Sequence, residues 1–184
     1  MTAEGMVDKV GSSEGFGFDA SNGRSPMEHQ VIHGFVTIVK NQGLENEEVL
    51  CKDKHNLLTN GGRDAMHDAL YVDISATQTG FNNIALSTNA SGALATHTAV
   101  AGEITTGGLE RVQATTRSHG VGTNTSTVAH TFTSSAVHTA VQLAGLFDVA
   151  TAPVSGILGH ENTFTPASLE SADTLTVTWT LTLG

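Results

Sequence analysis

The chain has 184 residues, the size of a single domain with a hydrophobic core. Eight Lys and Arg stand against eighteen Asp and Glu, a formal net charge of -10, and no run of basic residues is present, which argues against nucleic-acid binding. The single cysteine, Cys51, excludes an intramolecular disulfide and a cysteine-based zinc finger. No apolar stretch is long enough to span a membrane and no signal-sequence pattern opens the chain, so a cytosolic or self-assembling product is expected.

Residues 1–28 are expected to form an extended assembly arm, and residues 29–184 a folded domain. The arm is rich in Gly and Ser and has no regular apolar period along its length. Such a segment cannot offset the entropy of ordering its own backbone, so we expect it to become ordered by docking onto another surface. Phe16 and Phe18 are the candidate anchors for assembly. A flexible, unattached terminus is the alternative.

The first part of the domain predicts a β-hairpin followed by a short helix. The β-rich run 31–39 ends at a turn, and residues 47–55 return as the second strand. Thr59 or Asn60 is placed to cap a helix over residues 61–71, in which the apolar positions 65, 66, 69 and 70 share one face.

Further strands are predicted at 81–87, 109–116, 126–132, 137–143, 154–158 and 174–183, with a loop at 88–98 and one helical turn at 100–104. Strands 126–132 and 137–143 are expected to pair as a hairpin. The last strand alternates most regularly, with Thr on one face and, on the other, Leu175, Val177, Trp179, Leu181 and Leu183. Together these elements predict a mainly all-β fold, an antiparallel β-sandwich of jelly-roll-like type with one short helix.

The nine histidines raise the question of a metal site. His29 and His33 lie four residues apart on an extended segment, about 13 Å, which is too far to share one ion. His130 and His138 are the best candidates because the expected hairpin would bring them face to face, yet a zinc site needs further ligands. A hydrogen-bonded surface pair is therefore expected, and neither a metal nor another cofactor is predicted.

The sequence contains none of the common catalytic motifs: no G-x-S-x-G elbow, no H-E-x-x-H, no phosphate-binding loop and no dinucleotide-binding glycine motif. Lys52 and Lys54 are placed to lower the pKa of Cys51, but no base can be assigned, so a structural thiol is expected. The carboxylates at 45, 47 and 48 fit a solvated turn better than the acid pair of a glycosidase, even with Glu110 added. No catalytic residue is predicted, and a β-sandwich hydrolase is the weakest alternative.

Three stretches of the domain carry a family resemblance. The first is KHNLLTNGGRD at 54–64 followed by IALST at 84–88, the second is VQLAGLF at 141–147, and the third joins FTP at 164–166 and Leu169 to DTLTVTW at 173–179. In this order and spacing, over about residues 30–184, they resemble a family of small structural proteins of tailed bacterial and archaeal viruses, of tail-fibre, collar or head-decoration type. Leu143 stands where that family would have an acidic residue, and Ser87 where it would have a glycine.

The resemblance implies assembly rather than catalysis. It marks residues expected to maintain the fold: Gly61 and Gly62 at a tight start of the helix, Arg63 and Asp64 pairing with neighbouring strands, Gly145 at a bulge or close backbone approach, and Asp173 and Trp179 at the last strand. Their expected role is structural.

The expected function is therefore that of a non-enzymatic virion structural protein of a tailed virus, assembled in the host cytoplasm. It would self-associate and dock on major capsid, portal, neck or tail proteins, with capsid decoration or a collar position favoured over a fibre tip. None of the four Lys lies beyond Lys54, so few charges protect the sheet edges, and an uncharged self-contact with little salt dependence is expected. The resemblance suggests a trimer. The alternative is a receptor- or glycan-binding module of a tail fibre, relying on Tyr71, Phe81 and Phe147.

Overall fold

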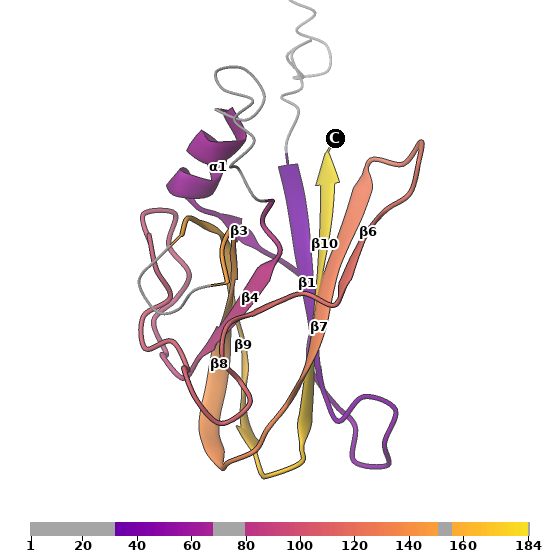
Figure 1. Cartoon of the computed structure of the whole chain (residues 1–184), viewed down its shortest axis with the longest axis vertical. Helices are drawn as coiled ribbons and strands as arrows, with labels where there is room; N and C mark the ends of the chain where they lie inside the picture. The colour runs from indigo at the N-terminus through magenta and orange to yellow at the C-terminus, as the bar shows by residue number, and fades with distance from the viewer. Residues whose placement is uncertain (1–31, 68–79, 151–155, 184) are drawn as a thin grey trace, which may run out of the picture. The chain divides into compact units, whose positions relative to one another are not determined.

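A computed structural model describes residues 32–67, 80–150 and 156–183 of the chain. They form two five-stranded antiparallel sheets that face each other, with one short helix, α1 (Asn60–His67) (Figure 1). The predicted arm, including Phe16 and Phe18, lies outside the described residues. So do Tyr71, the end of the predicted helix, and the start of the predicted strand 154–158.

The first sheet, called here the β1 sheet, has the strand order β2-β1-β10-β7-β6. Its strands are β1 (Ile32–Lys40), β2 (Glu48–His55), β6 (Thr116–His119), β7 (Thr125–Thr133) and β10 (Thr174–Leu183). The second, the β8 sheet, has the order β3-β9-β8-β4-β5 and consists of β3 (Leu57–Leu58), β4 (Asn83–Ser87), β5 (Val112–Gln113), β8 (His138–Phe147) and β9 (Leu158–Leu169).

The hydrophobic core lies between the two sheets. Strand β10 contributes Leu175, Val177 and Trp179, all fully buried, and these alternate with half-buried Thr residues as predicted. The β8 sheet supplies residues such as Ile84 and Leu146 to the same continuous cluster. Because each sheet hides one apolar face against the other, the all-β sandwich predicted from the sequence is confirmed. The strand order does not establish a jelly roll, which stays a prediction.

The hairpin of β1 and β2 and the start of α1 also agree with the prediction. Thr59 is the residue before the helix, and its hydroxyl accepts a hydrogen bond from the Gly62 N–H at 3.0 Å, as an N-cap does. The same hydroxyl donates to the carbonyl of Leu158. The cap therefore also joins the helix to β9.

Three sequence expectations about the elements are wrong. The predicted hairpin of 126–132 with 137–143 does not form, because the chain crosses from one sheet to the other between them: β7 pairs with β6 and β10, and β8 pairs with β4 and β9. Residues 100–104 form a turn bridged to Ser87 rather than a helical turn. The predicted strand 109–116 is reduced to β5, while β6 begins at its last residue.

Strand β9 is the element that the sequence patterns miss. Its first residues, Leu158 to Asn162, are buried without alternation, because the β9 backbone at this end is covered by the β1 sheet on one side and by α1 and the segment near Leu94 on the other. Pro166 lies inside the same strand, next to a register irregularity in its pairing with β8. A strand buried in this way has no period of two to detect.

Candidate functional site

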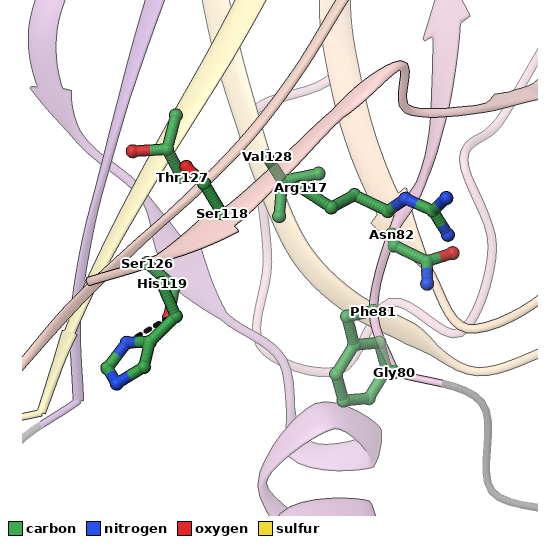
Figure 2. A pocket seen from close by; sticks show the side chains of 9 residues that line it. All are labelled: Gly80, Phe81, Asn82, Arg117, Ser118, His119, Ser126, Thr127 and Val128. Carbon is green, nitrogen blue, oxygen red and sulfur yellow. Dashed lines mark hydrogen bonds between the residues drawn. The ribbon is translucent and has the colours of Figure 1, made fainter. Parts of the chain in front are cut away.

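An open pocket of about 260 Å³ lies at one flank of the sandwich (Figure 2). One wall is the β6–β7 pair of the β1 sheet, in which Arg117, Ser118 and His119 are paired with residues 126–128. The other wall is the segment 80–82 that leads into β4. Phe81 is half-buried and gives the pocket its aromatic surface. The sequence placed Phe81 in a strand but did not bring it together with β6.

The charge in this pocket comes from Arg117. It stands opposite Val128 in the β6–β7 ladder, and directly opposed residues share a face, so Arg117 points to the inner side of the sheet. Figure 2 shows its side chain extending toward the wall that contains Phe81 and Asn82. Within the described residues no carboxylate pairs with Arg117. His119 is held locally, because its Nδ1 lies 3.1 Å from the Thr125 carbonyl and 3.3 Å from the Ser126 hydroxyl.

A second concentration of chemistry-bearing groups lies on β9, where His160, Glu161 and Asn162 are consecutive and buried. Asn56 Nδ2 donates to His160 Nδ1 at 2.7 Å, which leaves the ring proton on Nε2. Burial lowers the pKa of His160 to about 4, so the ring is neutral at physiological pH. Asn162 donates to the carbonyl of His55 at 3.0 Å and thereby joins β9 to the end of β2.

Glu161 points away from His160, toward the loop that precedes residue 100. Its Oε2 lies 2.8 Å from His97 Nδ1 and accepts from the Leu94 N–H at 3.3 Å. Glu161 is fully buried, whereas 26% of the His97 side chain is exposed. The pair therefore fixes a loop onto β9.

The histidine pair proposed for a metal does not form. His130 on β7 pairs with Val177, and His138 on β8 pairs with Leu169, so the two belong to different sheets. His33 instead meets His55, with Nδ1 and Nε2 3.3 Å apart, on the exposed face of β1 and β2. Across the described parts of the chain no three His, Cys, Asp or Glu side chains gather to hold a metal ion. His29 lies outside those parts.

Cys51 lies half-buried on β2, with its Sγ 3.6 Å from the Val36 carbonyl. Burial raises the pKa of the thiol and outweighs the lowering effect of the neighbouring Lys54. The acidic residues 45, 47 and 48 are exposed around the β1–β2 turn, as a solvated turn predicts. Glu110 accepts from the Gly108 N–H at 3.2 Å within its own loop.

The glycines marked by the resemblance lie at close contacts. Gly62 packs on Gly159 of β9, where a Cβ atom would lie 2.5 Å from the Gly159 carbonyl oxygen. Gly145 keeps regular register with its neighbours rather than forming a bulge, but a Cβ there would collide with the side chain of Val100. At Gly61 a Cβ atom would lie 3.3 Å from the side chain of Ile157 and 3.9 Å from the Leu158 carbonyl oxygen, so no backbone atom is close.

The other marked residues divide into two groups. Asp173 and Trp179 have the structural role expected of them, since Trp179 is fully buried. The Asp173 carboxylate accepts hydrogen bonds from the Glu170 N–H and from Asn41 Nδ2, both at 2.9 Å. Its Oδ2 also lies 3.2 Å from the Lys40 ammonium. Those hydrogen bonds, the backbone one first, lower the pKa of Asp173. Arg63 and Asp64 do not behave as expected. Both are exposed, and Arg63 donates to Asn60 of its own helix.

Ser87, which stands where the resembled family would have a glycine, has a structural role of its own. This side chain is buried, and its hydroxyl donates to the Ala101 carbonyl at 2.6 Å and accepts from the Asn89 N–H at 2.9 Å. Ser87 thus ties the loop after β4 to residue 101. Leu143 is buried in the apolar cluster of the β8 sheet, a position that would not tolerate an acid without a partner.

The aromatic residues on which receptor or glycan binding would rely are not gathered on one surface. Phe147 is buried, and the guanidinium of Arg111 lies 3.6 Å from its ring centroid. Phe81 lines the pocket, and Tyr71 lies outside the described residues.

No protein-family model, curated protein or solved structure matched the chain. In the described residues, no helix has both the length and the apolar character needed to cross a membrane.

Proposed function

We propose that the chain is a non-enzymatic structural protein of a tailed virus particle that associates with itself and with other capsid, neck or tail proteins. The observation that carries the proposal is the place of the three family-like stretches in the fold. Their marked residues, such as Gly62, Gly145 and Asp173, contact neighbouring backbone or core and do not line a common cavity. Residues arranged in this way preserve a scaffold.

The surface of the β1 sheet supports the same proposal. The β7–β10 pair presents Thr side chains that bond across the strands, as in the 2.9 Å contact between the hydroxyls of Thr131 and Thr176. The neighbouring edge strand β6 is exposed and carries no lysine. A weakly charged, hydroxyl-rich surface next to an edge strand without Lys or Pro suits permanent protein contacts better than a freely diffusing monomer.

The test is mass spectrometry of purified particles after heads and tails have been separated. The proposal expects the chain in one of these fractions at a stoichiometry that is a multiple of the local symmetry. Recovery of the chain only in the soluble fraction of the lysate, with none in particles, would overturn it.

Light scattering of the purified chain at low and high salt tests the self-association. An oligomer that persists in high salt is expected, because charges contribute little to the contact. A trimer is proposed before a dimer. A monomer at concentrations resembling those in a particle contradicts this part of the proposal.

A further inference from the structure

Strand β6 (Thr116–His119) is one of the two edge strands of the β1 sheet, the other being β2. Among the described residues β6 pairs only with β7, and all four of its residues are exposed. In an antiparallel ladder alternate residues turn both their N–H and C=O groups away from the paired neighbour. Two of the four β6 residues therefore present backbone groups to a further strand. Neither Lys nor Pro protects this edge.

The pocket continues this edge toward the interior. A strand added beside β6 would direct every second side chain to the inner side of the sheet, the side on which Arg117 and the buried Val128 lie. Phe81 forms the opposite wall there. The site thus combines unpaired backbone, an aromatic surface and one cation without a carboxylate partner in the described part of the chain.

The sequence of the N-terminal arm fits these three features. Although the arm has no period over its whole length, residues 15–18 read Gly-Phe-Gly-Phe. In an extended strand Phe16 and Phe18 share one face about 7 Å apart, and the glycines leave the other face bare. Glu14 and Asp19 flank the pair and complement the charge of the exposed Arg117, which orients the contact and adds little to its strength.

We propose that residues 14–19 from the arm of a second copy of the chain pair with the free edge of β6 and place Phe16 and Phe18 in the pocket beside Phe81. The proposal rests on the proposed function, because it names the contact through which the copies associate. The twelve residues 20–31 span up to about 40 Å when extended, compared with about 14 Å across the strands from β1 to β6. The arm is long enough to reach past its own body to a neighbour.

The test is disulfide trapping with two full-length chains, each carrying Cys51→Ser. One chain carries Gly17→Cys in the arm. The other carries Thr116→Cys, which lies on the outer face of β6 and is not one of the residues that line the pocket. The chains are mixed under a mild oxidant, and the heterodimer is measured on a non-reducing gel. The control partner carries Glu45→Cys in the exposed β1–β2 turn.

We expect roughly tenfold more heterodimer with a β6 cysteine than with Glu45→Cys, because the contact raises the effective concentration of the two thiols. Adding Phe16→Ser and Phe18→Ser to the arm should reduce the yield to that of the control, whereas Met6→Ser and Val7→Ser should not. Equal yields for β6 and the control overturn the proposal. So does a chain carrying both Gly17→Cys and Thr116→Cys that forms only an intrachain disulfide, since the arm then docks on its own body.

Light scattering and particle analysis separate this proposal from the wider one. If the chain occurs in particles and is oligomeric but β6 gives no specific heterodimer, the arm contact is wrong and the structural function stands. If the heterodimer forms but the chain is missing from particles, the contact stands and the virion function is wrong.

Discussion

Arg111 and Glu103 form a two-point ion pair inside the domain: Nε donates to Oε1 at 2.8 Å and Nη2 to Oε2 at 2.6 Å. The Arg111 side chain is fully buried and the Glu103 side chain is 1% exposed. Arg111 also stacks on Phe147. Glu103 lies in the turn that bridges to Ser87, and Arg111 directly precedes β5. The ion pair therefore holds together the long connection between β4 and β6.

The first prediction concerns this ion pair. Arg111→Met should lower the free energy of unfolding by about 3–5 kcal/mol, because it leaves the Glu103 carboxylate buried without its cation. The double substitution Glu103→Met with Arg111→Met should recover part of the loss. Urea denaturation of the single and double variants measures both effects. A double variant no more stable than Arg111→Met would show that the buried charge is not the cause.

The second prediction concerns Trp179, the largest fully buried side chain. Trp179→Ala should cost about 3–5 kcal/mol of stability, since it removes the ring and leaves a cavity between the sheets. Trp179→Phe should cost clearly less. The Phe ring fills most of the space. The substitution also removes the indole N–H of Trp179, which is buried and has no hydrogen-bond partner in the described structure. Thermal denaturation ranks the variants, and similar losses for both would contradict the packing argument.

The third prediction compares two adjacent glycines of α1. Gly62→Ala should destabilise the protein by about 1–3 kcal/mol, because the new methyl group would press on the Gly159 backbone, which cannot move aside. Gly61→Ala is the matched control. Its nearest neighbour is the Ile157 side chain, and the Leu158 carbonyl lies at ordinary contact distance, so the substitution should be neutral or stabilising by up to about 1 kcal/mol through helix propensity. If Gly62→Ala melts at the same temperature as Gly61→Ala, the helix does not pack on β9 as described.

The fourth prediction is a dependence of stability on pH. The pKa of His160 is about 4 in the folded protein and near 6.5 in the unfolded chain, because burial disfavours the charged ring. Its contribution is fully present above pH 6.5 and is lost as the pH falls from 6.5 toward 4, by about 3 kcal/mol in all. His130, whose pKa is also lowered by burial, adds a contribution of the same sign.

Urea denaturation at a series of pH values measures this slope, and His160→Gln should flatten most of it. His130→Gln serves as the comparison. An unchanged slope in His160→Gln would place the titration elsewhere. Asp173 contributes in a separate pH range. Because its pKa is lowered in the folded protein, the stability that its carboxylate adds is lost only as the pH falls below the ordinary pKa of a carboxyl group.

The elements predicted from the sequence are those whose pattern arises from one buried face. Strand β10 alternates apolar residues with Thr because one face packs on the core and the other faces outward, and β1 and β2 are separated by a clear turn. Strand β9 was missed for the opposite reason. Its first residues are covered on both faces, and the cover is polar enough to accept His160, Glu161 and Asn162.

The contacts around the candidate site could not be predicted because they join segments far apart in the chain. Phe81 and Arg117 line the same pocket from opposite walls, and this depends on where each strand lies in its sheet. The same limit explains the histidines. His130 and His138 are close in sequence, but four residues at 134–137 carry the chain from one sheet to the other, and local spacing does not show whether a turn stays within its sheet.

The two ends of the sandwich differ in what closes them. At one end three separate connections are joined through Asp173. Asn41 Nδ2 donates to its carboxylate at 2.9 Å, and the Ser134 N–H donates to its backbone carbonyl at 2.8 Å. Ile32, the first described residue, lies at the opposite end, where it pairs with Leu183. The building block therefore has a direction, and copies joined by their arms associate head to tail, so that three of them can close into a ring in which every arm and every β6 edge is used.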